Sequence, residues 1–208
     1  MARTARFDRQ VALHRAVELF WSRGYYASSM KHIEEALDMR PGSLYATFGS
    51  KSGLFSEALD AYAARSGDEF AQILDRAPSV IEGIKGYLQA LAGRCMGTAH
   101  APARACLLVK TLLEVNTEDA ALRAKVEALL ALIEARLYAA LTRAKAAGEL
   151  RADVDCQRLA RLLQAQIMGL RVVHDDGTPV GWGASLTRNL LRFVDVLPFG
   201  YCLGLISC

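Results

Sequence analysis

Apolar residues along the chain follow a helical repeat almost throughout. Near the start they recur three or four residues apart, at Leu13, Ala16, Val17 and Phe20, and Gly24 follows. This is the pattern of an amphipathic helix closed by a glycine. Farther along, similar patterns are separated by short breaks, and no alternation of apolar and polar residues typical of strands interrupts them. The sequence therefore predicts an all-α fold.

The breaks divide the later part of the chain into further helices. One continuous helical pattern runs over residues 50–74. Breaks are expected at residues 77–78, 98–102, 116–117, 148–153 and 175–183. The last two amphipathic segments cover residues 156–173 and 184–197. A long helix after Ser50 is thus expected to join the N-terminal part to the rest.

Residues 28–55 predict two short helices joined by a tight turn. Ser28 or Ser29 can cap the first helix with its hydroxyl group. The turn falls around Asp38, and Pro41 stands where a proline favours the first position of a second helix. In a helix-turn-helix the second helix lies in the DNA major groove while the first braces it across the backbone. This spacing favours a DNA-binding domain.

The same stretch carries a specific set of residues: Ser29-Met30, Ile33, Ala36, Gly42-Ser43-Leu44-Tyr45, Phe48, Lys51 and Leu54-Phe55. With them it resembles the N-terminal domain of TetR/AcrR-type bacterial transcriptional regulators. Two positions depart from the family pattern. Asp38 stands where glycine is usual, and asparagine or aspartate tolerates the left-handed backbone of such a turn. Arg40 replaces the small polar residue that usually opens the recognition helix.

The resemblance implies a set of DNA-binding residues. Tyr45 and Lys51 match family positions that hold phosphates, and Arg40, Ser43 and Ala46 are expected to influence which operator is chosen. The whole expected set is Ser29, Arg40, Pro41, Gly42, Ser43, Tyr45, Ala46 and Lys51.

Charge supports this expectation only through its distribution. The net charge of the 208 residues is +3, which is too small to indicate a nucleic-acid partner. Between Met1 and Lys31, however, six basic residues face only Asp8 and Glu18; they are Arg3, Arg6, Arg9, Arg15, Arg23 and Lys31. Such an arm can neutralise phosphates and give salt-dependent binding, although a solvated helix face has the same composition.

The most suggestive chemistry outside this region is the segment around Cys106. If a helix opens near Pro102, Cys106 lies about one turn in, and Lys110 follows four residues later on the same face. A helix N-terminus and a nearby cation both favour the thiolate, which reacts with electrophiles and oxidants. The segment is similar to one in the TetR subgroup that includes the repressors of N-ethylmaleimide reductase, with Ala105 replacing a glycine. A buried core cysteine is the alternative, and Cys95 is a candidate second thiol.

The resemblance also implies a helical C-terminal domain that binds an effector and forms a homodimer. We expect a DNA-binding domain at residues 1–50, an effector-binding and dimerisation domain at 51–197 and an apolar tail at 198–208. Effector-pocket candidates are Tyr87, Leu91, Tyr138, Met168, His174 and Trp182. Dimerisation candidates, which suit a four-helix bundle across a two-fold axis, are Leu162, Gln166, Leu170, Leu190, Leu191 and Val194.

Other functional classes are less well supported. The five cysteines have no metal-ligand spacing and the histidines show no i, i+4 pairing, so we expect neither a metal nor another cofactor. The tail is too short to span a bilayer, and no secretory signal is visible, which predicts a cytoplasmic protein, nucleoid-associated when bound to its operator. The sequence thus favours a non-enzymatic, dimeric repressor that binds a palindromic operator and is released by a small-molecule or thiol-reactive effector. The alternatives are a cysteine-dependent enzyme and a helical protein-interaction module.

Overall fold

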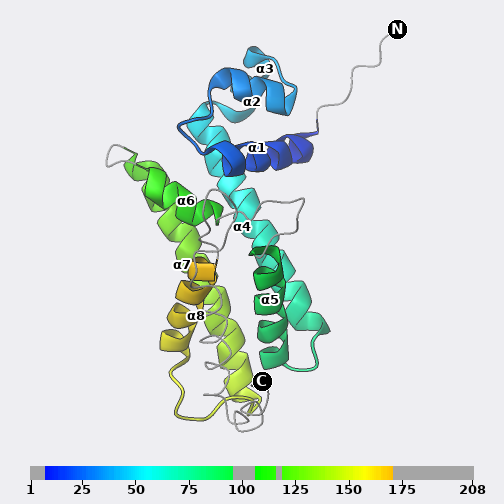
Figure 1. Cartoon of the computed structure of the whole chain (residues 1–208), viewed down its shortest axis with the longest axis vertical. Helices are drawn as coiled ribbons and strands as arrows, with labels where there is room; N and C mark the ends of the chain where they lie inside the picture. The colour runs from blue at the N-terminus through cyan, green and yellow to red at the C-terminus, as the bar shows by residue number, and fades with distance from the viewer. Residues whose placement is uncertain (1–7, 96–105, 116–118, 171–208) are drawn as a thin grey trace, which may run out of the picture. The chain divides into compact units, whose positions relative to one another are not determined.

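The computed structural model describes residues 8–95, 106–115 and 119–170, and every regular element within these ranges is an α-helix (Figure 1). The predicted all-α fold is therefore confirmed for the part of the chain that is described. The helices are α1 (Arg9–Arg23), α2 (Met30–Leu37), α3 (Pro41–Phe48), α4 (Lys51–Arg76), α5 (Val80–Cys95), α6 (Leu107–Glu114), α7 (Ala120–Ala146) and α8 (Cys156–Leu170). The breaks expected at 98–102, 116–117 and 175–183 and the segment at 184–197 fall wholly or mainly outside these ranges.

α1 begins after a side-chain cap and ends at Gly24, where the sequence predicts its stop. The Asp8 side chain caps the helix by accepting hydrogen bonds from the backbone N–H groups of Gln10 and Val11, at 2.9 and 3.3 Å. At the other end the Gly24 N–H donates to the Phe20 carbonyl oxygen at 2.8 Å. Gly24 has φ 89° and ψ 171°, a backbone conformation that is essentially confined to glycine.

The turn between α2 and α3 also follows the sequence. Ser29 rather than Ser28 is the cap of α2. Asp38 adopts the left-handed conformation, with φ 54° and ψ 48°, so aspartate serves where glycine is usual in the family pattern. Pro41 occupies the first turn of α3, and the preceding Arg40 makes no side-chain cap hydrogen bond.

An aromatic cluster fills the centre of the N-terminal helices. The ring of Phe20 from α1 meets Phe55 from α4 edge to face, with 4.7 Å between centroids. Tyr25, in the turn after α1, stacks on Phe55 at the same centroid separation. Ile33 of α2 and Leu44 of α3 are also completely buried, and Leu37 and Phe48 are buried beside them, so each of the two helices is anchored by two apolar side chains. Such packing makes the first three helices and the start of α4 one rigid group.

The helices group into two compact units. Of the residues described, the first unit contains 8–65, 107–115 and 119–129, and the second contains 66–95, 106 and 130–170. α4 contributes to both units, as expected for the long helix after Ser50. α7 also contributes to both. The grouping of α6 and the first part of α7 with the N-terminal helices differs from the boundary at residue 50 drawn from the sequence.

The second unit has a core drawn from α4, α5, α7 and α8. Its large buried side chains are Phe70, Leu74, Ile84, Tyr87, Leu88, Leu91, Leu137, Leu141, Leu163 and Ile167. The start of α5 is held by Glu149, whose carboxylate accepts hydrogen bonds from the N–H groups of Val80 and Ile81, at 3.2 and 2.8 Å. A carboxylate at a helix N-terminus satisfies unpaired donors and interacts favourably with the helix dipole.

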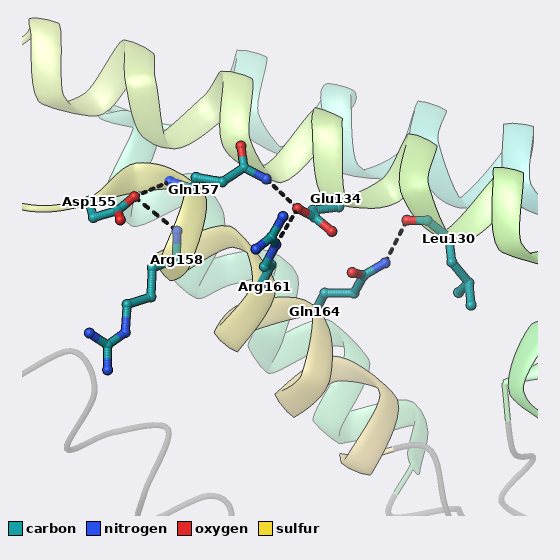
Figure 2. Close-up of polar contacts among 7 residues, drawn as sticks. All are labelled: Leu130, Glu134, Asp155, Gln157, Arg158, Arg161 and Gln164. Atoms are coloured by element: carbon teal, nitrogen blue, oxygen red, sulfur yellow. Dashed lines mark hydrogen bonds and ion pairs between the residues drawn. The ribbon is translucent and has the colours of Figure 1, made fainter.

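Polar contacts join α8 to α7 along one side (Figure 2). Glu134 accepts hydrogen bonds from Gln157 and from Arg161, the latter at 2.9 Å. One turn farther on, the Gln164 amide donates to the Leu130 carbonyl oxygen at 2.6 Å. Asp155 caps α8 by accepting from two backbone N–H groups. These contacts fix which side of α8 faces α7.

A substitution at Gly24 tests how strictly the end of α1 is defined. A Cβ atom at this position would collide with the Glu114 carboxylate, in addition to the strain of a positive φ. We expect Gly24→Ala to lower the free energy of unfolding by about 2–3 kcal/mol, measured by chemical denaturation. Gly42→Ala is the control, because a Cβ there meets no atom within 4 Å. Equal stability of the two variants would contradict this role of Gly24.

Candidate nucleic-acid interface

α3 presents most of its surface to solvent. Leu44 and Phe48 are buried and hold the helix from one side. The remaining expected contact residues, Arg40, Pro41, Gly42, Ser43, Tyr45 and Ala46, are all exposed. Tyr45 keeps 50% of its surface accessible, which is unusual for a large aromatic side chain in a short, well-anchored helix. The structure thus brings these residues together on the outer side of one helix.

Ser29 lies at the start of α2 and is engaged in a reciprocal cap. Its hydroxyl accepts a hydrogen bond from the His32 N–H, and Nδ1 of His32 accepts from the Ser29 N–H, both at 3.2 Å. The role of His32 as an acceptor in this cap was not expected from the sequence, because the third position of a capping box is usually glutamate or glutamine. The cap fixes the N-terminus of α2, and the other hydrogen-bonding capacity of the exposed Ser29 hydroxyl remains available.

Lys51, at the first position of α4, is not a fully exposed cation. Its side chain is half-buried, and Nζ lies 4.5 Å from the centroid of the Tyr25 ring. Burial lowers the pKa of the Lys51 ammonium from its ordinary value. The pKa of Tyr25 is raised, first by burial and then by the nearby Asp119 carboxylate. The aromatic ring therefore defines where the ammonium group lies.

The basic residues expected to form a phosphate-binding arm have divided roles. Arg9 pairs with Glu57 at 2.6 Å and lies over the Phe48 ring, 5.1 Å from its centroid. Arg15 donates to the Leu37 carbonyl oxygen at 3.4 Å. These two arginines link helices to each other, whereas Lys31 is 83% exposed. Arg3 and Arg6 lie outside the described residues.

α6 contacts the end of α1 through two charged side chains. The Lys110 ammonium donates to the carbonyl oxygens of Trp21 and Ser22, at 3.1 and 3.2 Å. The last carbonyls of a helix lack partners inside the helix and attract cations. Glu114 accepts a hydrogen bond from the Tyr25 N–H at 2.8 Å. Glu114 could not be recognised from the sequence, because its partner is a backbone group 89 residues away.

Cys106 immediately precedes α6 and is buried. Because α6 begins at Leu107, the thiol does not lie one turn into a helix, which corrects the helix start near Pro102 expected from the sequence. Lys110 is bound to α1, and its ammonium is thus already satisfied by carbonyl oxygens. Cys95 is the last residue of α5, and its side chain lies outside what the structure describes.

The effector-pocket candidates have different environments. Tyr87 and Leu91 are buried in the core of the second unit, where the Tyr87 hydroxyl lies 3.2 Å from the Ser66 hydroxyl. Met168 is half-buried. Tyr138 is exposed on α7. His174 and Trp182 lie outside the described residues, so no common cavity can be assigned to the set.

α8 leaves one stripe of its surface uncovered. Ala160, Leu163 and Ile167 point into the core, while Leu162 and Ala165 are exposed. Among the other dimerisation candidates on this helix, Gln166 has a buried side-chain oxygen without a hydrogen-bond partner in the described part of the chain. Leu170 ends α8 and its side chain is not described; Leu190, Leu191 and Val194 lie outside the described residues.

The described residues contain no group of three or more histidine, cysteine, aspartate or glutamate side chains arranged to hold a metal ion. Of the helices that the structure describes, none has the length and apolar character needed to cross a bilayer.

Comparison with known proteins matches both parts of the chain. A model described as "Bacterial regulatory proteins, tetR family" matches residues 12–58. A second, described as "Tetracyclin repressor-like, C-terminal domain", matches residues 85–177. The HTH-type transcriptional repressor ComR of Escherichia coli (strain K12) is 30% identical over 187 residues, which make up 89% of this chain and 88% of ComR.

Solved structures agree with this assignment. A cysteine mutant of the TetR family transcriptional regulator CifR, complexed with 26-base-pair double-strand operator DNA, is 37% identical with a TM-score of 0.77, and the match covers 90% of this chain and 98% of that one. The reduced form of E. coli NemR has a TM-score of 0.76 at 18% identity, covering 91% of this chain and 96% of NemR. At that identity NemR shows the fold alone.

Proposed function

Because this chain belongs to the TetR family of bacterial transcriptional regulators, we propose that it acts as a dimeric repressor which binds a two-fold operator and is released by a thiol-reactive small molecule. The observation that carries the proposal is the outer side of α3, where the expected contact residues are exposed together above two buried anchors. ComR and CifR, a named repressor and a regulator solved on operator DNA, support the same function. Such a protein acts in the cytoplasm, where bacterial operators lie.

The residues of α3 divide into two kinds of DNA contact. Arg40, Ser43 and Ala46 carry short groups or a guanidinium that suit the edges of bases, so they select the operator sequence. The hydroxyl of Tyr45 and the ammonium of Lys51 suit phosphate oxygens, which position the helix without specifying sequence. Ser29 adds a hydroxyl at the start of α2.

Removal of one hydroxyl tests the phosphate contact of Tyr45. We expect Tyr45→Phe to weaken operator binding by about 1 kcal/mol for each protomer, or roughly 30-fold for the dimer, because each protomer loses one hydrogen bond to a charged oxygen. The salt dependence should stay the same, since the hydroxyl is neutral. Tyr138→Phe is the matched control: Tyr138 is also exposed, but on α7 in the second unit. Fluorescence anisotropy with a labelled operator measures both; equal affinities would contradict the contact.

Dimerisation follows from the two-fold operator, because a protein dimer presents one recognition helix to each half-site. The uncovered stripe of α8 supports a contact there. Leu162 is 43% exposed and Ala165, one turn farther on, is exposed as well, whereas Arg161 and Gln164 bond to α7. We include Gln166, Leu170, Leu190, Leu191 and Val194 in the proposed interface, which would resemble a four-helix bundle.

A charge in the stripe tests the interface. Leu162→Glu should shift the protein toward monomers and weaken operator binding at least tenfold, because burial of an unpaired carboxylate in an apolar contact is costly. Leu113→Glu is the control, since Leu113 is even more exposed but lies on α6. Light scattering at several protein concentrations reports the oligomeric state. An undiminished dimer for Leu162→Glu would remove α8 from the interface.

We assign effector sensing to Cys106. The thiol is buried just before α6, so an added group there must displace closely packed neighbours. α6 in turn contacts the end of α1 through Lys110 and Glu114. CifR, solved on DNA with cysteines replaced, and the similarity of the Cys106 segment to the subgroup of N-ethylmaleimide-reductase repressors support this choice. Cys95 is the candidate partner thiol, and the pocket candidates in the second unit would receive the non-reacting part of the molecule.

Cys106→Ser separates sensing from DNA binding. N-ethylmaleimide forms a bond between sulfur and one alkene carbon while the neighbouring carbon takes a proton. We expect it to lower operator affinity of the parent at least tenfold and to leave Cys106→Ser bound. Cys156→Ser, at another buried cysteine, should respond as the parent does. Mass spectrometry locates the adduct. A Cys106→Ser protein released like the parent would contradict the assignment.

A further inference from the structure

The turn formed by residues 24–26 is contacted from two directions within the first unit. From one direction come α6 and the residue before α7. Glu114 accepts the Tyr25 N–H, and Asp119 accepts the Tyr26 hydroxyl. A Cβ atom at Gly24 would force the Glu114 carboxylate to shift from its position. One carboxylate thus contacts the backbone of this turn, and the other contacts one of its side chains.

From the other direction comes Lys51, through the ring of Tyr25. Lys51 Nζ lies 4.5 Å from the ring centroid. The ring is itself stacked on Phe55 with 28° between planes, so it cannot rotate freely. Tyr25 thus contacts α6 through its backbone and the first residue of α4 through its side chain.

These two contacts are mechanically connected because they belong to one residue. A displacement of α6 that carries Glu114 away releases the Tyr25 N–H and lets the backbone move. The stacked ring moves with its Cα, and the ammonium attracted to the ring loses its defined position. The Lys51 side chain is half-buried, so its ammonium is partly desolvated, a condition that strengthens attraction to a ring.

We propose that Tyr25 is a positioning residue that couples α6 to DNA binding by holding the Lys51 ammonium where it meets a phosphate, with Glu114 as the contact on α6 that sets the position of Tyr25. The coupling rests on the proposed phosphate role of Lys51. The coupling gives Tyr25 and Glu114 a function beyond packing. Loss of either residue weakens DNA binding because the Lys51 ammonium is no longer held in position.

A double-mutant cycle on operator affinity tests the coupling between Tyr25 and Lys51. Lys51→Met should weaken operator binding of the dimer roughly 25-fold and reduce the slope of log K against log salt by about 1.8, as loss of one phosphate contact in each protomer requires. Tyr25→Leu should weaken binding roughly threefold in the parent but have no effect in the Lys51→Met background. Tyr25→Phe, which keeps the ring, should match the parent within about twofold.

A second cycle tests the contact on α6. Glu114→Gln retains size but lacks the charge that strengthens the bond to the Tyr25 N–H. It should weaken operator binding roughly twofold to threefold in the parent and not in the Lys51→Met background. The matched control is Glu149→Gln, because Glu149 also bonds to backbone N–H groups but lies in the second unit. It should lower thermal stability while leaving operator affinity and salt slope unchanged.

The outcomes separate the coupling from the phosphate contact. If Lys51→Met leaves operator affinity and salt slope unchanged, Lys51 does not bind phosphate, and both the phosphate contact and the coupling are overturned. If Lys51→Met weakens binding but the effects of Tyr25→Leu and Glu114→Gln add to it in full, the phosphate contact stands and the coupling is overturned. Circular dichroism confirms that each variant is folded at the assay temperature, and Tyr25→Phe supplies a folded variant with an intact ring.

Discussion

In the first unit, a hydrogen bond between the Tyr25 N–H and the Glu114 carboxylate holds the turn after α1 against α6, at 2.8 Å. A turn after a helix leaves backbone groups without partners, and burial of such a group without a hydrogen bond costs about 1–3 kcal/mol. Glu114 removes that cost with a charged acceptor, and Lys110, one turn earlier on α6, does the same for two carbonyl oxygens of α1. α6 therefore completes the DNA-reading helices, although it is distant from them in sequence.

The same contact explains why the structure divides where it does. The N-terminal helices alone would leave the end of α1 open, so the compact unit extends to include α6 and the first part of α7. Lys125 adds an ion pair with Asp60 on α4, at 2.6 Å.

Local signals in the sequence predicted much of the fold. The Gly24 stop, the Ser29 cap, the left-handed Asp38 and Pro41 at the start of α3 each depend on a few neighbouring residues, and all four are found in the structure.

Long-range partners were not predictable in the same way. Nothing near Glu114 or Glu149 indicates that each carboxylate binds backbone N–H groups at a distant helix end. The environment of Lys51 was missed for the same reason, because the ring beneath it comes from another helix end. The start of α6 was also predicted too early. Pro102 suggested a helix that begins before Cys106, whereas α6 begins at Leu107, directly after it.

The separation of Tyr25 from Glu114 along the chain also sets an order of events during synthesis. At the usual rate of translation, the ribosome needs about 4–18 s to add the 89 residues that separate the two partners. Throughout that interval the helices of the DNA-reading region can form their own aromatic core, but the turn that ends α1 has no acceptor for its N–H group. A nascent chain thus completes the contacts of this turn only after α6 has left the ribosome, so the end of α1 is the last part of the first three helices to acquire its hydrogen-bond partners.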